Sequence, residues 1–460
     1  MTETVKIVSP VDGRVYAERR VAGAAEIEAA VAKAKAARRA WGEVTVRERA
    51  KFLNHFVDAL LSKNDEIVPE LAWQMGRPIR FGGEKKGVEE RSRHMIDIAE
   101  AALAPSTRPD KPGFKRWIAR EPLGTVMVIA PWNYPFLTAV NSIVPGLMAG
   151  NAVILKHASQ TLLVGERFAE AMKAAGLPDG LFQNLVLNHA DTEKLIASGR
   201  IDHINFTGSV EGGRRIERAA AGTFATLGLE LGGKDPAYVR ADAGLDNAVE
   251  NLVDGSFFNS GQSCCGVERI YVHAAVYDKF VEGFVENAKG WTLGNPLDAA
   301  TVVGPMANTK GADLVREQTL EALRKGARSH LNSKHDLDKD GSPYLAPEVL
   351  TNVNHQMAVM REESFGPVVG IMKVADDDEA ITLMNDSPYG LTASIWTADL
   401  DAAARIGARV ETGTVFANRC DYLDPALVWT GVKDTGKGGG LSEIGYHNLT
   451  QPKSYHLKII

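Results

Sequence analysis

GTVMVIA at residues 124–130 and NAVILK at residues 151–156 are short, nearly continuous apolar runs that are rich in β-branched residues. Such runs are typical of strands that are buried on both faces of a parallel sheet. Two more runs of this kind follow, QNLVL at 183–187 and HINF at 203–206, and helical segments such as 161–176 lie between them. This alternation of strand and helix predicts an α/β domain of the Rossmann-like, dinucleotide-binding kind.

The flanking sequence extends the pattern in both directions. Before these runs, Asp12-Gly13 predicts a hairpin turn, and residues 24–41 and 45–64 have the apolar spacing of amphipathic helices. After residue 233 a second α/β pattern begins, with ERIYVH at 268–273 and PVVGIMKV at 367–374. The tail PKSYHLKII alternates like a strand, which predicts an edge strand or a strand that pairs with another chain.

The composition is that of an ordinary globular protein. Hydrophobic residues make up 45% of the 460 residues, charged residues make up 24%, and the formal net charge is −6. No basic stripe points to nucleic acid or to an anionic membrane, and no apolar run approaches the roughly 18 residues of a membrane span. Three cysteines and no visible signal peptide favour a reducing, cytoplasmic location. Metal-binding spacings such as C-x-x-C and H-E-x-x-H are absent, so we expect no metal site.

Two of the three cysteines, Cys264 and Cys265, stand side by side in FFNSGQSCCGVER at 257–269. By itself this segment suggests two small buried residues, and a disulfide between adjacent cysteines would be strained. Five other stretches change that expectation, in this order: PWNYPF at 131–136, LKHAS at 155–159, FTGSVEGG at 206–213, LELGGKDP at 229–236 and EESFGPV at 362–368. The ordered set resembles the aldehyde dehydrogenase superfamily over essentially the whole chain. The short length and the LKHAS motif are similar to the compact bacterial succinate-semialdehyde dehydrogenases.

The resemblance implies three catalytic residues. Cys264 matches the nucleophile, and a thiolate suits attack on an aldehyde. Asn133 matches the side-chain amide that stabilises the resulting oxyanion, although by itself it could simply cap the next helix. Glu230 matches the base that activates water to hydrolyse a thioester, with a structural ion pair as the alternative. Glu230 also argues against a branch that transfers the acyl group to coenzyme A.

The resemblance also implies a site for a nicotinamide cofactor. The matching residues are Trp132, Lys156, Ser159, Gly208, Ser209, Gly213, Glu363 and Phe365. Gly208 and Gly213 match the pyrophosphate turn, where Ser209 supplies a donor at a helix N-terminus. Many NAD-dependent members have Glu where Ser159 stands, and that Glu repels a 2′-phosphate. With Ser159 and Lys156 here, we expect NADP to be accepted, and NAD remains the alternative.

The substrate side is less well defined. Tyr134, Phe258 and Trp429 are candidates for an aromatic tunnel wall, and ordinary core packing explains them equally well. Asn141 stands where the succinate-semialdehyde branch has a carboxylate-binding Arg, and Arg419 could replace that cation. Gly440 stands where many members have a Glu that helps proton transfer, so any relay there must differ.

The fold implied by the resemblance has three parts. Residues 1–104 and 122–232 form an NAD(P)-binding domain, and residues 233–435 form an α/β catalytic domain. Residues 105–121 and 436–460 form a small β bridging and oligomerisation element, which implies a homodimer or a homotetramer. The expected function is oxidation of an aldehyde to a carboxylic acid. Specific oxidation of an acidic aldehyde is the alternative, and a non-catalytic family member is a remote one.

Overall fold

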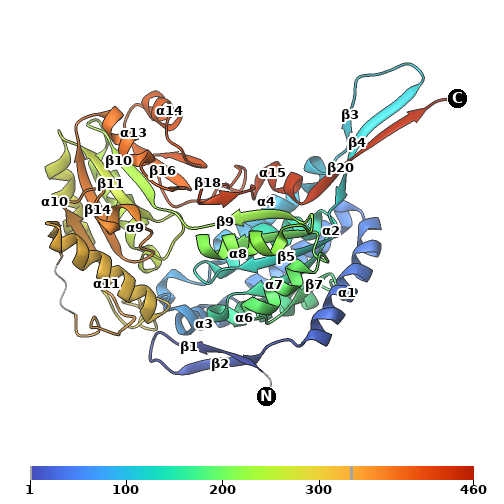
Figure 1. Cartoon of the computed structure of the whole chain (residues 1–460), viewed down its shortest axis with the longest axis horizontal. Helices are drawn as coiled ribbons and strands as arrows, with labels where there is room; N and C mark the ends of the chain where they lie inside the picture. Colours follow the sequence, from blue (N-terminus) through green and yellow to red (C-terminus); the bar gives the residue numbers. More distant parts are fainter. Residues whose placement is uncertain (1–2, 332–334) are drawn as a thin grey trace.

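A computed structural model describes residues 3–331 and 335–460, so residues 1–2 and 332–334 of the expected domains lie outside the described residues. The chain forms two α/β bodies side by side, and a narrow β extension leaves the first body at the end remote from the second (Figure 1). Among the described helices, none is long and apolar enough to cross a membrane.

The first body is built on a six-stranded sheet in the order β19-β9-β8-β5-β6-β7. Its pairs are parallel except for the one between β19 and β9. The strands are β5 (Thr125–Ala130), β6 (Ala152–His157), β7 (Phe182–Asn184), β8 (His203–Thr207), β9 (Thr226–Glu230) and β19 (Gly436–Lys437). The apolar runs that predicted β5, β6 and β8 are therefore confirmed as strands, whereas QNLVL was predicted too long, because β7 ends at Asn184.

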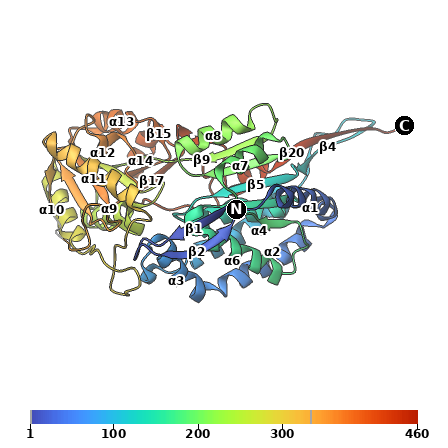
Figure 2. The ribbon, with the colours of Figure 1, turned by 60° about the horizontal axis from the view of Figure 1, so that its bottom comes forward.

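Helices cover both faces of this sheet. In Figure 2, α7 and α8 lie on one face, and α2, α4 and α6 lie on the other. The helices of this body are α1 (Ala24–Glu43), α2 (Val46–Leu61), α3 (Asn64–Met75), α4 (Lys85–Ala102), α5 (Pro135–Met148), α6 (Leu162–Ala174), α7 (His189–Ala197), α8 (Val210–Ala220) and α15 (Ser442–Asn448). The two predicted amphipathic helices are α1 and α2, and the reciprocal hydrogen bonds of Thr45 and Glu48 start α2.

The second body is built on a seven-stranded sheet in the order β12-β13-β14-β11-β10-β16-β17. The strands are β10 (Asp235–Val239), β11 (Val267–His273), β12 (Arg328–Ser329), β13 (Glu348–Thr351), β14 (Val368–Val374), β16 (Thr392–Trp396) and β17 (Thr414–Ala417). The helices are α9 (Leu245–Phe257), α10 (Tyr277–Ala288), α11 (Thr309–Arg324), α12 (Ala358–Arg361), α13 (Asp377–Asn385) and α14 (Leu400–Gly407). Successive side chains alternate between two cores: Ala237 and Val239 pack with α9 and α10, and Tyr238 packs with the other helices.

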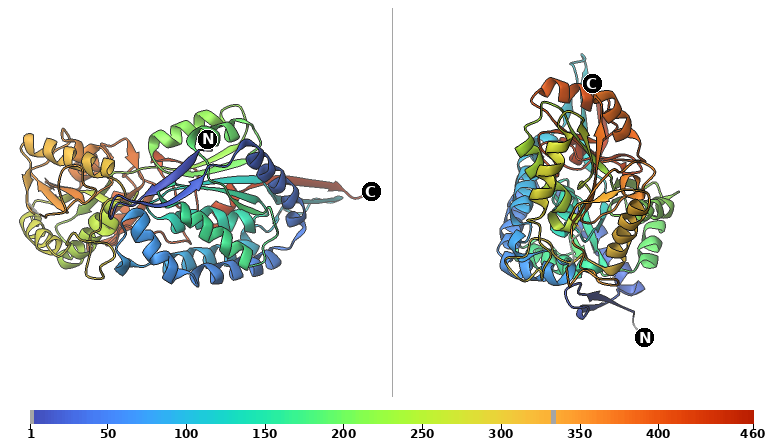
Figure 3. Two further views of the ribbon diagram at one scale, coloured as in Figure 1. Left: turned by 90° about the horizontal axis from the view of Figure 1, so that it is seen from below. Right: turned by 90° about the vertical axis from the view of Figure 1, so that its left-hand side faces the viewer.

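The extension is a three-stranded sheet of β3 (Ser106–Thr107), β4 (Phe114–Pro122) and β20 (Thr450–Lys458), in the order β20-β4-β3. β20 pairs antiparallel with β4 from Thr450 opposite Pro122 to Lys458 opposite Phe114. Both panels of Figure 3 show this sheet projecting beyond the helices of the first body. Residues 436–449, which were expected in the extension, lie instead with the first body, because β19 pairs with β9 and α15 packs against α4.

Short elements complete the fold. The expected N-terminal hairpin consists of β1 (Thr4–Val8) and β2 (Val15–Arg20), and β15 (Tyr389–Gly390) pairs with β18 (Val432–Lys433). Two short 3₁₀ turns are η1 (Ile79–Phe81) and η2 (Ser159–Thr161), and η3 (Phe258–Gly261) is a turn that contains left-handed residues. The strands β5, β8 and β9 are parallel, so their carboxyl ends meet at one edge of the first sheet, where open α/β sheets bind ligands.

Candidate active site

A cavity of about 700 Å³ lies at this carboxyl edge, facing the second body. Ten of the residues singled out in the sequence line it: Trp132, Asn133, Lys156, Ser159, Gly208, Ser209, Glu230, Cys264, Glu363 and Phe365. Gly213, Tyr134, Phe258 and Trp429 lie outside its lining. The structure therefore brings together the three candidate catalytic residues and most of the candidate cofactor residues.

The two adjacent cysteines have different surroundings. Cys264 is partly exposed and lines the cavity, whereas Cys265 is buried. The Cys265 thiol donates to Asp421 Oδ1 over 2.8 Å. Its contact with Cys264, together with burial, raises the pKa of the Cys265 thiol well above its ordinary value. Of the two, only Cys264 is open to a molecule in the cavity.

The turn before the cysteines has a left-handed backbone conformation, which residues other than glycine rarely adopt. Asn259 and Ser260 both have positive φ angles, 55° and 58°, and Gly261 follows with 69°. A Cβ atom at Gly261 would lie 2.3 Å from Gly366 O, so glycine is required for the close approach of these two loops. This turn fixes the position of Cys264 relative to the loop that carries Glu363.

Asn133 is held in place by the same turn. Its Nδ2 donates to Gln262 O over 3.2 Å, and its backbone oxygen accepts from Arg77 Nη2 over 2.5 Å. Asn133 does not cap α5, because the carboxylate of Glu84 accepts from the N–H groups of Phe136 and Leu137. One amide hydrogen of Asn133 is free of this bonding, and the side chain borders the cavity.

Glu230 is the last residue of β9 and borders the same cavity as Cys264. Burial raises the pKa of its carboxyl to about 7, while a hydrogen bond from Thr207 and the charge of Arg91 act in the opposite direction. In the described part of the chain Glu230 has no ion-pair partner, so an ion pair does not account for it. A Cβ atom at Gly440 would lie 3.2 Å from Glu230 Oε1, which leaves little room for a larger side chain there.

Glu363 enters the cavity from the second body. Its Oε1 accepts from the N–H of Gly233 over 2.9 Å, and a Cβ atom at Gly232 would lie 2.4 Å from the same oxygen. The two glycines of LELGGKDP thus make room for this carboxylate. Burial, and after it the charge of Glu268, raise the pKa of Glu363 to about 7.

A buried ion pair holds the Glu363 loop. Lys234 Nζ lies 2.6 Å from Glu268 Oε2 and donates to Ser364 Oγ over 2.9 Å. Glu268 in turn accepts from the N–H groups of Ser364 and Phe365, each over 2.8 Å. The ring of Phe365, at φ 51°, meets Trp132 edge-on at 5.6 Å.

The far end of the cavity contains a buried cation. Lys156 is 5% exposed, and burial lowers its pKa to about 8. Lys156 has no ion-pair partner within the described residues, whereas Arg215, which also lines the cavity, pairs with Glu193 over 2.6 Å. Ser209 caps α8 by accepting from Gly212 N over 3.2 Å, and a Cβ atom at Gly213 would lie 2.6 Å from the Leu231 side chain. Gly213 therefore allows α8 to approach the loop after β9.

The candidate tunnel residues lie outside the lining of this cavity and make contacts of their own. Arg77 lies 5.0 Å from the ring centre of Tyr134, and Phe258 meets Phe81 edge-on at 4.8 Å. Trp429 is 4% exposed and exchanges two backbone hydrogen bonds with Gly440. Arg419 is exposed, and its guanidinium lies 3.4 Å from the ring centre of Tyr422.

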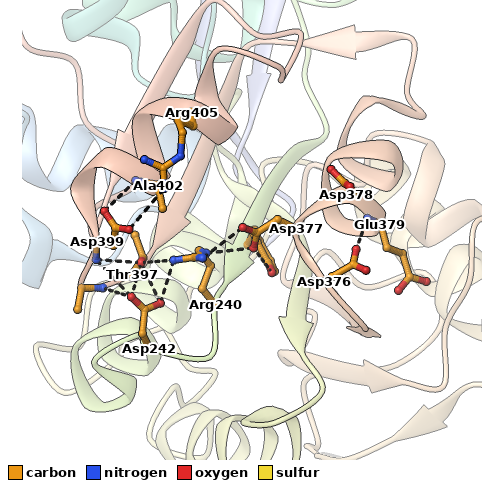
Figure 4. Close-up of polar contacts among 12 residues, drawn as sticks. Arg240, Asp242, Asp376, Asp377, Asp378, Glu379, Thr397, Asp399, Ala402 and Arg405 are labelled. Atoms are coloured by element: carbon orange, nitrogen blue, oxygen red, sulfur yellow. Dashed lines mark hydrogen bonds and ion pairs between the residues drawn. The ribbon is translucent and has the colours of Figure 1, made fainter.

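A second polar cluster lies at the carboxyl edge of the other sheet (Figure 4). Arg240, directly after β10, donates to Asp377 Oδ1 over 3.0 Å and to Thr397 Oγ1 over 2.9 Å. Thr397 also donates to Asp242, and Asp399 caps α14 by accepting from Ala402 N. In the described residues no group of His, Cys, Asp and Glu has the arrangement of a metal site.

Comparison with known proteins agrees with this geometry. The model of the aldehyde dehydrogenase family matches residues 1–455. The chain belongs to the aldehyde dehydrogenase family. It is 36% identical to an aldehyde dehydrogenase of Paenarthrobacter nicotinovorans over 93% of this chain and 94% of that protein. It is 34% identical to a succinate-semialdehyde dehydrogenase [NADP(+)] of Mycobacterium avium (strain 104), over 98% and 96% of the two chains.

A solved structure confirms the fold class. A 3,6-anhydro-L-galactose dehydrogenase in complex with NAP superimposes with a TM-score of 0.93 at 30% identity, covering 99% of this chain and 95% of that one. The resemblance drawn from the ordered motifs is thus confirmed, and the chain is an aldehyde dehydrogenase.

Several residues around the predicted site were not singled out in the sequence. Arg77, Glu84, Arg91 and Asp421 lie outside the quoted motifs, and Glu268 lies within FFNSGQSCCGVER but was given no role. The backbone of Glu84 is unusual, with φ 64°, but the sequence alone does not reveal this conformation. Glu84 is the N-cap and Arg91 the seventh residue of an ordinary charged helix, α4, and nothing in that helix's sequence sets them apart.

Proposed function

We propose that this aldehyde dehydrogenase oxidises its substrate to the free carboxylic acid with NADP⁺, or alternatively NAD⁺, through Cys264, Asn133 and Glu230. The observation that carries the proposal is that these three residues border one cavity whose far end is lined by Lys156 and Ser159. The two sheets then correspond to an NAD(P)-binding domain of residues 1–104 and 122–232 and to a catalytic domain of residues 233–435.

In this proposal the Cys264 thiolate adds to the aldehyde carbon, and the carbonyl electron pair moves onto oxygen. The backbone N–H of Cys264 and the free amide hydrogen of Asn133 stabilise that oxyanion. A bound nicotinamide supplies the acceptor for the two electrons that leave with the carbon-bound hydrogen. Cys264 is then held as a thioester.

Glu230 completes the proposed cycle. As a carboxylate it takes a proton from water, and the resulting hydroxide adds to the thioester carbon. The C–S bond then breaks and returns the Cys264 thiolate. A base with a pKa of about 7 matches this role, because it is partly ionised at neutral pH and still basic enough to accept the proton.

The donor set at the far end of the cavity fits a 2′-phosphorylated cofactor. Lys156 is a buried cation without a carboxylate partner in the described part of the chain, and Ser159 offers a hydroxyl without negative charge. Lys156 would contact the adenosine ribose and its 2′-phosphate, Ser209 would lie at the pyrophosphate, and Glu363 would hold the other ribose. The relative named for NADP(+) supports this choice.

Specific oxidation of an acidic aldehyde is the second candidate, supported by a relative named succinate-semialdehyde dehydrogenase. Transfer to coenzyme A and a non-catalytic role are disfavoured, since Glu230 and Cys264 both border the cavity. We also propose a homodimer or homotetramer, because β20 presents an exposed edge on the projecting extension. Mass measurement during size-exclusion chromatography tests this, and a monomer would contradict it.

The two cysteines provide the test of the catalytic assignment. We expect Cys264→Ala to lower the rate of NADPH formation by about 1,000-fold or more with every aldehyde tested, because the covalent route is lost. Cys265→Ala is the matched control and should retain activity, since the Cys265 thiol is turned away toward Asp421. Wild-type turnover in the Cys264 variant would contradict the proposal.

A further inference from the structure

Arg77 is a buried cation whose three nitrogen atoms donate to three different segments around the site. Its Nε donates to Asn259 Oδ1 over 3.1 Å, and its Nη2 donates to the backbone oxygen of Asn133 over 2.5 Å. Its Nη1 pairs with Glu84 Oε1. A guanidinium is planar and holds its N–H groups at fixed angles, so these contacts fix the three segments relative to one another.

The contact with Asn259 reaches the turn that leads to Cys264. Asn259 is buried with φ 55°, and its Nδ2 donates to the backbone oxygens of Asn133 and Gln262, each over 3.2 Å. The same oxygen of Gln262 accepts from Asn133 Nδ2 over 3.2 Å. Together with the two bonds from Arg77, these hydrogen bonds form a closed network. In the chain this network ends two residues before Cys264.

The contact with Glu84 fixes the start of α5. Glu84 Oε2 accepts from the N–H groups of Phe136 and Leu137 over 3.0 Å and 2.7 Å. The side chains of Glu84 and Arg77 are each 3% exposed, so the ion pair is shielded from water. The left-handed backbone of Glu84 is a conformation that persists only where the surroundings impose it. Asn133 lies two residues before α5, so the pair acts on it through its backbone oxygen and through the helix that follows.

Arg77 itself does not border the cofactor cavity. Asn133 and Cys264 line that cavity, whereas Arg77, Glu84 and Asn259 lie outside its lining. A buried ion pair adds little net stability over apolar residues of the same volume, because the cost of desolvating both charges offsets their attraction. The placement of a donor, by contrast, strongly affects the rate of a reaction that passes through an oxyanion. A positioning role therefore accounts for the Arg77–Glu84 pair better than stability alone.

Building on the proposed function, we propose that Arg77 is a positioning residue for the oxyanion. It holds the Asn133 amide at the distance from Cys264 at which its free hydrogen meets the oxygen of the bound aldehyde. Glu84 orients Arg77 and the start of α5 at the same time. Asn259 joins the amide to the turn before Cys264, so the two oxyanion donors keep a fixed separation.

The test measures the first turnover, in which excess enzyme and NADP⁺ are mixed with a limiting aldehyde. The aldehyde is the one that wild-type enzyme oxidises fastest among propanal, benzaldehyde and 4-oxobutanoate. We expect Asn133→Ala to lower the rate constant of NADPH formation by about 100-fold to 1,000-fold, as loss of one oxyanion donor does. Arg77→Met should lower it by about tenfold to 100-fold, because the amide remains but is displaced. The dissociation constant of NADP⁺ should stay near that of wild type, since Arg77 lies outside the cavity lining.

A double-mutant cycle shows whether Arg77 acts through Asn133. In the Asn133→Ala background the amide is already absent, so Arg77→Met should lower the rate further by less than about threefold. Independent effects would instead multiply. Arg77→Lys keeps a charge opposite Glu84 and should recover part of the rate in the wild-type background. The same cycle is run with Arg77→Lys if Arg77→Met does not fold.

Arg167→Met is the matched control for loss of an ion pair. Arg167 pairs with Glu70 in the same body, and their side chains are 20% and 13% exposed. Both residues lie outside the cavity lining. This variant should unfold at a lower temperature than wild type and keep the wild-type rate of the first turnover.

The outcomes separate this proposal from the proposed function. If wild-type enzyme reduces neither NADP nor NAD with these aldehydes, or if Asn133→Ala leaves the rate unchanged, the proposed function fails and the role of Arg77 fails with it. If Asn133→Ala is slow but Arg77→Met is as fast as wild type, or if the two effects multiply, only the role of Arg77 is overturned. An equal loss of rate in Arg167→Met would also overturn it, since any such ion pair would then have the same effect.

Discussion

Two charged clusters lie at corresponding places in the two sheets, and they differ in how their charges are balanced. Both occupy the carboxyl edge of parallel strands, where α/β proteins bind ligands. Around Arg240, charged groups are paired with groups of opposite charge. The hydrogen bond to Asp377 stabilises the charged form of Arg240 and raises its pKa. The pKa of Asp377 is lowered, since its bonds to Arg240 and Tyr238 outweigh its burial.

In the cavity of the first sheet the shifts have the opposite sign. Burial raises the pKa values of Glu230 and Glu363 and lowers that of Lys156, so each group is pushed toward its neutral form. A cluster that stabilises its own charges needs no ligand. The unbalanced charges of the cavity support its choice as the candidate active site.

The largest effect expected in the cavity, beyond loss of Cys264, comes from Glu230→Gln. We expect kcat to fall by about 100-fold to 10,000-fold, because no base remains to activate water. A single burst of NADPH should survive, since acylation does not need this base. In wild-type enzyme kcat should rise with pH around the pKa of about 7, and the variant should lack that rise.

Rapid mixing of enzyme, NADP⁺ and aldehyde measures the burst and the slower turnover together. Loss of the burst along with turnover would assign Glu230 to acylation.

Cofactor preference provides a second, smaller test at the end of the cavity that contains Lys156. Ser159→Glu places a carboxylate beside the buried Lys156 and should balance its charge. We expect the ratio of kcat/KM for NADP to that for NAD to fall by about tenfold to a hundredfold, because like charges repel the 2′-phosphate. Ser159→Ala removes the hydroxyl without adding charge and should leave the ratio near that of wild type. An unchanged ratio in the glutamate variant would show that this end of the cavity does not bind the phosphate.

The same comparison explains what could be predicted from the sequence. Strands β5 and β6 are continuous apolar runs, and the cavity residues Asn133, Glu230 and Cys264 each belong to a short loop motif. Such motifs are local in the chain and can therefore be recognised from the sequence.

The contact between α4 and α5, unlike these loop motifs, could not be predicted from the sequence. Arg91 and Arg93 are two positions apart in one charged helix, yet Arg91 is buried and Arg93 reaches Asp58 at the surface. Only packing against α5 distinguishes them, and that contact joins residues about fifty positions apart. The boundary of the extension could not be predicted for a similar reason. Residues 436–449 contact β9 and α4, which are distant in the sequence.

The smallest effect belongs to the balanced cluster, where Arg240→Met should change stability and leave kcat unaltered. We expect a loss of about 1 kcal/mol at pH 7, since the pair with Asp377 is partly exposed to solvent. Because the folded pKa of Asp377 lies below its ordinary value of 3.8, the stabilisation by Asp377 is present above pH 3.8 and is lost as the pH falls through the folded pKa. The variant and wild type should therefore converge in stability in acid.

In the same unfolding measurements, the stability of Glu230→Gln relative to wild type should change with pH in the opposite direction. The folded pKa of Glu230 is raised from 4.5 to about 7, so ionising it costs stability increasingly between those two values. Relative to wild type, the free energy of unfolding of the glutamine variant should increase as the pH rises through that window. That of Arg240→Met should decrease as the pH rises from acid. Equal slopes in the two variants would mean that both clusters balance their charges alike, and the distinction between them would fail.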